Sequence, residues 1–206
     1  MSENSRAIKL AEANQKLANK RKGAKEKWGI VLDTSKCIDC KACTVACKME
    51  NYVPVGFYNY RIWVAEDTHY AKYPIVNRSF QPSQCQQCEN PPCVHVCPTH
   101  ASYKTADGVV MVDSKKCILC KYCMTACPYD ARYESHTTEA IDKCTFCYQR
   151  REEGKDPACV ETCPPKVRVF GDLNDPNSEV YKLLAENEYT VLKPGKGTKP
   201  KLKYIK

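Results

Sequence analysis

The chain has 206 residues, sixteen cysteines and a formal net charge of +8. Its length suffices for one compact domain or two small halves. The cysteine density excludes an ordinary cytosolic enzyme with a few reduced thiols, and it leaves disulfides, zinc or iron–sulfur clusters as explanations. Because large aliphatic residues are modest in number, we expect metal–thiolate bonds to help hold the fold together.

The N-terminal residues 5–27 are rich in Ala, Lys, Asn and Glu and predict a helix with a weak apolar face. Two interpretations stay open: a solvated extension, or a helix that clasps a partner subunit and lets a basic arm reach an acidic or membrane surface. The first thirty residues lack the apolar core of a signal peptide, so none is expected. Since no run of about eighteen apolar residues occurs, no membrane-spanning helix is expected either.

Two short predicted strands, 29–32 and 109–112, each run into a cysteine-rich loop. The segments 33–47 and 113–127 share nine identities in fifteen positions, which is an internal repeat. A weaker similarity pairs Pro91-Pro-Cys-Val-His-Val-Cys-Pro98 with Pro157-Ala-Cys-Val-Glu-Thr-Cys-Pro164. The pattern indicates a duplicated sequence of ferredoxin-like units, each with a strand, a cysteine loop and a short helix.

Later segments predict further elements. Residues 61–64 and 167–170 predict short strands, and 177–186 predicts a short helix that Asn177 or Ser178 caps. The basic loop 193–200 contains two Pro and two Gly, and we expect it to wrap over a surface, either the chain's own or a partner's.

The cysteines fall into four groups of four. In sequence order, the groups are Cys37, Cys40, Cys43 and Cys47; Cys85, Cys88, Cys93 and Cys97; Cys117, Cys120, Cys123 and Cys127; and Cys144, Cys147, Cys159 and Cys163. The first and third groups have the C-x2-C-x2-C-x3-C spacing of bacterial ferredoxins. In that spacing three thiolates point at one [4Fe–4S] cubane, while the fourth reaches a neighbouring cluster. Which fourth cysteine joins which cluster is not set by the spacing.

Zinc and disulfides fit this pattern poorly. Zinc sites use separated C-x2-C pairs and have no use for a third cysteine two residues on and a fourth after three more. Cysteines two residues apart cannot all find disulfide partners without strain. Oxidised cubanes with four thiolates each carry a charge of about −2, so four would offset the basic excess. The +8 charge therefore does not indicate nucleic-acid binding.

The order of the motifs resembles the four-cluster iron–sulfur subunits of the dimethyl sulfoxide reductase (molybdopterin) superfamily. It looks most like the electron-transfer subunit of polysulfide reductase, with thiosulfate and tetrathionate reductases as near relatives. The matching segments include DTSKCIDCKACTVACKMEN, QCQQCENPPCVHVCPTHASY, DGVVMVDSKKCILCKYCMTACPYDARY, KCTFCYQR and PACVETCP. The resemblance covers about residues 29–204 and leaves out the N-terminal extension.

The resemblance implies an α+β fold: duplicated bacterial dicluster-ferredoxin-like units with short β-hairpins, short helices and long loops around four cubanes. It pairs the first motif with the fourth and the second with the third. The implied ligands are Cys37, Cys40, Cys43 and Cys163 for cluster 1; Cys47, Cys144, Cys147 and Cys159 for cluster 2; Cys85, Cys88, Cys93 and Cys127 for cluster 3; and Cys97, Cys117, Cys120 and Cys123 for cluster 4.

The expected organisation follows these pairings. Its parts are a basic helical extension (1–28), a first ferredoxin-like half (29–80), an inserted second unit with the second and third motifs (81–135), a return to the first half (136–175), and a C-terminal helix and wrapping tail (176–206).

The resemblance also implies partners. Electrons would pass between a membrane quinol/quinone subunit with several spans and a catalytic subunit holding bis-molybdopterin guanine dinucleotide, with no catalytic site in this chain. The implied location is peripheral, on the extracytoplasmic (periplasmic) face of the cytoplasmic membrane, after export with a signal-bearing partner; a cytoplasmic location is the alternative. The alternative function is the iron–sulfur subunit of a soluble or membrane formate dehydrogenase, hydrogenase or transhydroxylase complex.

Residues beside the ligands have two interpretations. Six lysines either raise cluster potentials or are solvated: Lys36, Lys41, Lys48, Lys116, Lys121 and Lys143. Aromatic residues expected to shield the clusters from water are Tyr122, Phe146 and Tyr148. His95 either donates to a cluster sulfur or is exposed.

Overall fold

The computed structural model describes residues 3–20, 26–56, 58–70 and 76–206. Its helices are α1 (Glu3–Lys20), η1 (Thr34–Lys36), α2 (Ala42–Glu50), α3 (Pro92–His95), α4 (Tyr122–Thr125), α5 (Tyr148–Glu152), α6 (Ala158–Glu161), α7 (Glu179–Glu186) and η2 (Pro194–Lys196). Its strands are β1 (Trp28–Asp33), β2 (Ile62–Tyr70), β3 (Val76–Gln84), β4 (Ser102–Lys104), β5 (Val110–Val112), β6 (Tyr133–Ser135), β7 (Ala140–Asp142), β8 (Arg168–Asp172) and β9 (Leu202–Ile205). Of the helices in these ranges, none is long and apolar enough to cross a bilayer.

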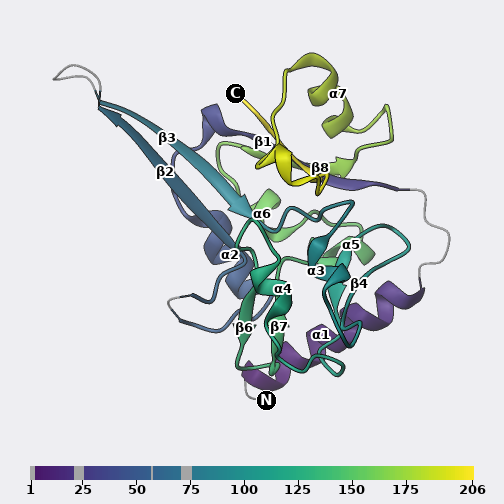
Figure 1. The fold of residues 1–206 in the computed structure, drawn as a ribbon. Helices are drawn as coiled ribbons and strands as arrows, with labels where there is room; N and C mark the ends of the chain where they lie inside the picture. Colours follow the sequence, from purple (N-terminus) through teal and green to yellow (C-terminus); the bar gives the residue numbers. More distant parts are fainter. Residues whose placement is uncertain (1–2, 21–25, 57, 71–75) are drawn as a thin grey trace.

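Short strands form small sheets, and short helices lie beside them (Figure 1). One sheet has the order β8-β1-β9, with β1 antiparallel to β8 and parallel to β9. The other strands form the hairpins β2–β3, β4–β5 and β6–β7. The predicted fold class, ferredoxin-type units with short hairpins and helices, is confirmed. The predicted strands at 29–32, 61–64, 109–112 and 167–170 are all present, and β2 extends further than predicted, to Tyr70.

Five strands were not predicted from the sequence: β3, β4, β6, β7 and β9. β9 is a short run with an internal lysine, and it forms because its parallel partner β1 has four fully buried central residues. β3 carries the polar residues of VNRSFQPSQ and pairs with β2 along its whole length. Figure 1 shows this ribbon projecting from the body of the molecule.

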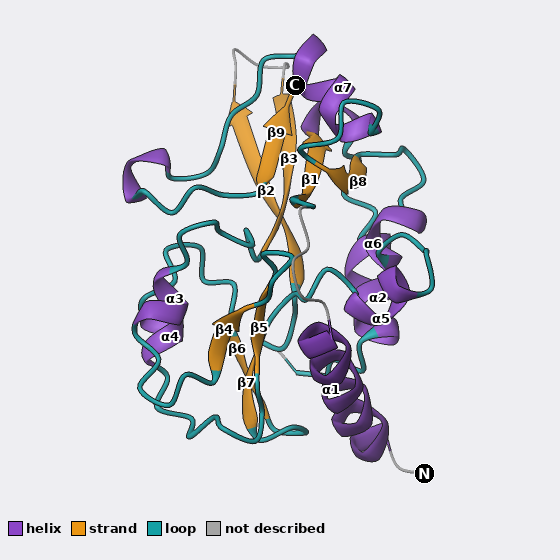
Figure 2. Cartoon of the chain, turned by 90° about the vertical axis from the view of Figure 1, so that its right-hand side faces the viewer, coloured by secondary structure: helices purple, strands orange, loops and turns teal. Residues whose placement is uncertain are grey.

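Four short helices form two pairs, which lie on opposite sides of the molecule in Figure 2. α2 packs against α6, and α3 packs against α4. Each of these four helices carries cysteines of one motif, so each contact brings two distant motifs together. The main hydrophobic core contains the side chains of Ile30, Leu32, Phe146, Tyr148 and Leu202, together with the thiol of Cys144.

The predicted N-terminal helix is present as α1, and it lies against the rest of the protein along α5 (Figure 2). Ala7 and Ala18 are buried, Asn14 Nδ2 donates to Gln149 Oε1 at 3.0 Å, and Lys115 pairs with Glu12 at 3.0 Å. The helix is therefore not a solvated arm. The predicted segments 1–28 and 29–80 also include residues 1–2, 21–25, 57 and 71–75, which lie outside the described residues.

Of the two candidate caps of α7, Ser178 is the cap. Its Oγ accepts from Tyr181 N at 3.2 Å and donates to Asp172 O at 2.6 Å. Ser178→Ala is expected to lower the free energy of unfolding by about 1 kcal/mol, because one N–H of the first turn loses its acceptor. Urea unfolding followed by circular dichroism measures this. Asn177→Ala is the matched control, and an equal loss in both variants would contradict the cap assignment.

The C-terminal loop wraps over the protein's own surface. Glu89 N donates to Lys199 O at 2.9 Å, Asn90 N donates to Thr198 O at 3.1 Å, and the hydroxyls of Thr198 and Tyr129 lie 2.5 Å apart. Of the two surfaces expected for this loop, it therefore covers the chain's own, beside the second and third cysteine motifs.

The buried Lys201 should make stability depend on pH. Burial, with Lys104 nearby, lowers the pKa of Lys201 to about 8. Between that value and the ordinary lysine pKa of about 10.4, the unfolded state holds more protons than the folded one, so stability rises with pH. Thermal unfolding at several pH values from 8 to 10 should show this rise in the native protein and a smaller one in Lys201→Met. If stability rises equally steeply with pH in Lys201→Met, the pH dependence does not come from Lys201.

Candidate iron–sulfur centres

All sixteen cysteines lie within the described residues, and all are free thiols. No two of the cysteines are joined by a disulfide bond among these described residues. The first and third motifs share one loop conformation: Asp39 and Leu119 have φ of 57° and 55°, and Lys41 and Lys121 have φ of 57° and 62°. Left-handed residues alternating with ordinary ones turn successive N–H groups inward, a concavity that favours anions. The sequence repeat is thus a repeat of backbone geometry.

Three cavities are each lined by four cysteines, three from one motif and one from a distant motif. The first set is Cys37, Cys40, Cys43 and Cys163; the second is Cys47, Cys144, Cys147 and Cys159; the fourth is Cys97, Cys117, Cys120 and Cys123. The cavities enclose about 310, 250 and 320 Å³ of empty space, part of it open to solvent.

The third set, Cys85, Cys88, Cys93 and Cys127, is brought together beneath Tyr129 and Ala131. Burial, together with the thiolates of the other three members, raises the pKa of Cys88 to about 12.

These donors fit a cubane. Its four thiolates surround a cluster of eight atoms, so they stand around a cavity instead of meeting at one point. Among the described residues, no three His, Cys, Asp or Glu side chains are arranged around a single metal ion.

Burial disfavours the thiolate forms of several of these cysteines. It raises the pKa of Cys144 to about 11, and it also raises the pKa values of Cys47 and Cys159 despite nearby arginines. Cys97 is the exception, because N–H donors, led by Ser102 N at 3.3 Å, outweigh burial and lower its pKa. Buried thiolates need a metal to compensate their charge, as cluster irons do.

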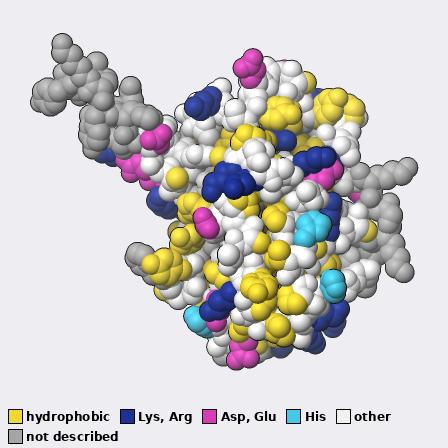
Figure 3. Space-filling view, viewed as in Figure 1, with side chains coloured by type: hydrophobic (Ala, Val, Ile, Leu, Met, Phe, Trp, Pro, Cys, Tyr) yellow, Lys and Arg dark blue, Asp and Glu magenta, His cyan; other side chains and the backbone are white. Residues whose placement is uncertain are grey.

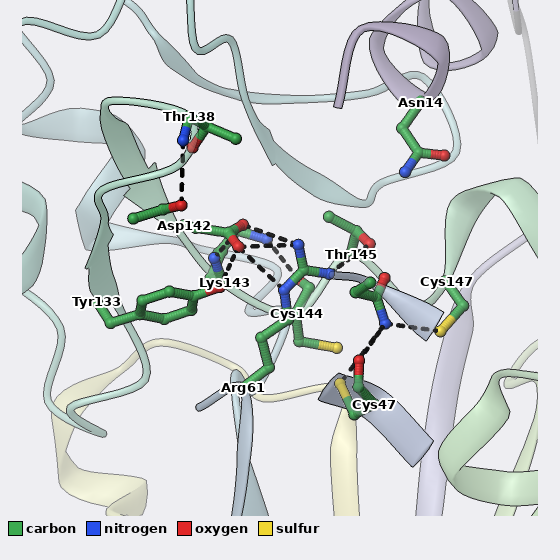
Figure 4. Close-up of polar contacts among 12 residues, drawn as sticks. Asn14, Cys47, Arg61, Tyr133, Thr138, Asp142, Lys143, Cys144, Thr145 and Cys147 are labelled. Carbon is green, nitrogen blue, oxygen red and sulfur yellow. Dashed lines mark hydrogen bonds and ion pairs between the residues drawn. The ribbon is translucent and has the colours of Figure 1, made fainter. Parts of the chain in front are cut away.

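Side-chain amides donate toward the sulfurs of the second set. Asn51 Nδ2 lies 3.6 Å from both Cys47 Sγ and Cys147 Sγ, the two cysteines labelled at the right of Figure 4. Gln84 Nε2 lies 3.7 Å from Cys144 Sγ. Such bonds raise cluster potentials. The sequence analysis missed both residues. Asn51 could have been found from its position four residues after Cys47, on the same helix face, whereas Gln84 carries no local signal.

The flanking lysines differ from one another. Four are exposed and paired with carboxylates: Lys36 with Asp33, Lys41 with Asp39, Lys116 with Asp113 and Lys121 with Glu134. Lys48 donates to Asn59 O, and only Lys143 among the six is fully buried. The structure thus singles out Lys143 as the lysine able to act on clusters through a low-dielectric interior.

The three aromatic residues and His95 also differ from one another in how far they are exposed. Phe146 and Tyr148 are buried, as expected of shielding residues, but Tyr122 is 66% exposed. His95 is exposed, and its Nε2 lies 3.0 Å from Asn90 Oδ1, so that nitrogen faces the amide and not a cluster.

The arrangement defines a ferredoxin-type iron–sulfur protein, and the comparisons agree. Two family models, both described as 4Fe-4S dicluster domains, match residues 76–173 and 36–101. The sequence is 39% identical to a subunit of the tetrathionate reductase of Salmonella typhimurium, over 96% of this chain and 80% of that protein. It is 45% identical to a component of the polysulfide reductase of Wolinella succinogenes, over 86% and 93%.

A third relative is the thiosulfate reductase electron transfer subunit of Salmonella typhi, 43% identical over 76% of this chain and 80% of that protein. The chain is a member of the family of [4Fe–4S] electron-transfer subunits of tetrathionate, polysulfide, thiosulfate and dimethyl sulfoxide reductases. The resemblance inferred from the motifs is confirmed, and the formate dehydrogenase, hydrogenase or transhydroxylase alternative is not favoured.

Proposed function

We propose that the chain holds four [4Fe–4S] clusters, one on each cysteine set, and conducts electrons along them in the order of the sets. The observation that carries the proposal is the lining of three separate cavities by four cysteines each. The clusters supply one-electron redox chemistry, and the protein supplies thiolates, N–H donors and dry surroundings.

The order of the clusters follows from the links between sets. α2 carries Cys43 of the first set and Cys47 of the second, four residues apart. Cys93 and Cys97 likewise join the third set to the fourth. Cys85 is close enough to Cys144 for its thiolate to raise the pKa of Cys144, which joins the second set to the third. In this proposal residues 29–80 with 136–175 form one half, and 81–135 form the other.

The two terminal sets contain the most exposed cysteines. Cys40 and Cys120 are the exposed cysteines, and the neighbouring Ile38 and Ile118 are each 63% exposed. Electrons enter and leave at these two loops. On the face shown in Figure 3, lysines and arginines are scattered among hydrophobic and acidic side chains and form no basic stripe, which suits protein partners better than nucleic acid.

The partners in this proposal are a catalytic subunit with bis-molybdopterin guanine dinucleotide and a multi-span membrane subunit that handles quinol. The chain itself carries no catalytic site and is peripheral to the extracytoplasmic face of the membrane. The relatives' names, which describe components of reductases, support a complex. Purification of the tagged protein from its own cells, with metal analysis of whatever copurifies, tests this. A soluble complex without molybdenum or tungsten would refute it.

The cluster count gives a direct prediction. The full-length protein, purified anaerobically, should contain about sixteen irons and as many acid-labile sulfides, since each cubane has four of each. Cys159→Ala should remove about a quarter of the iron or leave a three-iron centre. Thr162→Ala, three residues on, is the control. An iron content near zero in the native protein would overturn the proposed function.

A further inference from the structure

Six lysine and arginine side chains are buried among the described residues, and they differ in whether a carboxylate lies beside them. Arg61 pairs with Asp142 at 2.9 Å, and Arg151 pairs with Asp107 at 2.7 Å (Figure 4 shows the first pair). Four others have no carboxylate within 4 Å among the described residues, although they are only 1–6% exposed: Arg132, Lys143, Arg168 and Lys201. Lys201 lies in the C-terminal tail, where its Nζ donates to Gly108 O and burial lowers its pKa to about 8. The other three, Arg132, Lys143 and Arg168, lie beside cysteines.

A buried cation without a counter-charge is costly, so these three need negative charge nearby. For the two arginines, Nη2 is buried and has no hydrogen-bond partner. In both cases the side chains next to the guanidinium include cysteines. Anionic clusters on those cysteines would supply both the charge and the acceptors.

Arg168 lies between the first and second sets. It lines the cavity of the first set, and its Nη1 donates to Gln84 Oε1, while Gln84 Nε2 reaches Cys144 Sγ in the second. Burial alone would lower the pKa of Arg168, but the thiolates of Cys159 and Cys43, one from each set, outweigh it.

Lys143 lies between the second and third sets. Its Nζ donates to Val110 O and, at 2.7 Å, to Cys144 O. Burial lowers its pKa, and the strongest opposing effect comes from Cys85 of the third set, ahead of Cys144 of the second. Both carbonyls also face Gln87, whose Nε2 donates to Cys144 O at 2.7 Å, so the ammonium is held in place.

Arg132 lies between the third and fourth sets. Its Nη1 donates to Ser102 Oγ at 2.9 Å, and Ser102 N donates to Cys97 Sγ of the fourth set at 3.3 Å. Burial would lower its pKa, but Cys93 of the third set and Cys123 of the fourth raise it.

We propose that Arg168, Lys143 and Arg132 are electrostatic positioning residues, one at each junction between consecutive clusters, that raise the potentials of the two clusters they separate. A fixed positive charge stabilises the reduced cluster, which carries one more negative charge than the oxidised one. Each electron step then passes a cation in a low-dielectric interior. This inference rests on the proposed function, because it needs clusters on the four sets.

The test is a redox titration of the full-length protein, anaerobically purified and followed by electron paramagnetic resonance. Arg132→Gln removes the charge, and Arg132→Lys keeps it. At a fixed solution potential, the ratio of reduced to oxidised cluster should fall at least tenfold in the Gln variant for a cluster beside Arg132. For a one-electron couple, this fall corresponds to a reduction potential lowered by about 59 mV. In the Lys variant the ratio should stay within about threefold of native. Arg168→Gln should shift a different cluster.

The control is Lys116→Gln, which removes an exposed lysine beside Cys117; it should change no ratio by more than about threefold, because solvent screens the charge. Native iron content is measured first and decides the proposed function separately. Unchanged ratios in Arg132→Gln with full iron content overturn the inference. If Arg132→Gln loses iron, Arg132→Lys decides: full iron and native ratios support the inference, and loss in both variants overturns it.

Discussion

Removal of iron by a chelator in the presence of a reductant is expected to unfold the protein. One of the small hydrophobic clusters consists of Cys43, Cys47, Cys159 and Ile62, and another of Cys93, Cys123, Val110 and Ile141. In both, half or more of the buried residues are cysteines, so the metal centres occupy the places where another protein would have aliphatic side chains. Without them, cavities of about 250–320 Å³ face thiols.

Three measurements check this expectation: iron content, near-ultraviolet circular dichroism, and the rate of limited proteolysis. Dichroism and protease resistance should be lost in step with iron, because binding energy is folding energy when the site exists only in the folded state. The reductant without the chelator is the control. A protein that lost nine-tenths of its iron yet kept its native dichroism would show that the apolar core suffices.

Asp107→Asn is expected to lower the free energy of unfolding by about 3–5 kcal/mol, since it leaves a buried guanidinium without a counter-charge. Arg151 and Asp107 are 3% and 0% exposed and lie 2.7 Å apart. Arg151 also stacks over Trp28, 4.5 Å from the ring centroid. Asp107 accepts from Tyr148 OH at 3.2 Å, so the pair ties β1, α5 and the β4–β5 turn together.

Urea unfolding of the iron-loaded protein measures this loss. Glu153→Gln is the matched control, because the Lys155–Glu153 pair is about 60% exposed on both sides, so solvent screens it and its loss should change the free energy of unfolding little. The double variant Asp107→Asn/Arg151→Met should recover part of the loss by removing the stranded charge. Equal effects in Asp107→Asn and Glu153→Gln would refute the role assigned to the buried pair.

The same pair contributes a pH dependence. Burial opposes ionisation of Asp107, but hydrogen bonds from Thr105 and Arg151 outweigh it and lower its pKa below the usual 3.8. The stabilisation is therefore fully present above the unfolded value and is lost as the pH falls through the folded one. Asp107→Asn should lack this component of acid sensitivity, which pH-dependent unfolding below about pH 4 would reveal.

The sequence by itself determined the class of protein, because that information is local. The spacing of Cys117, Cys120 and Cys123 sets where three thiols can point, and the repeat of 33–47 at 113–127 predicts the same loop twice. Strands next to these loops and the cap of α7 were also predictable, since turn and capping chemistry acts over a few residues.

Only the tertiary structure decided what depends on segments far apart. It brought Cys163 into the cavity of Cys37, paired the C-terminal β9 with β1, and laid α1 along α5. It also placed Arg168, Lys143 and Arg132 between cysteine sets, where charge without a partner is tolerated only beside an anion. No spacing rule encodes these contacts, because each is made by packing across the core and not between neighbours in the sequence.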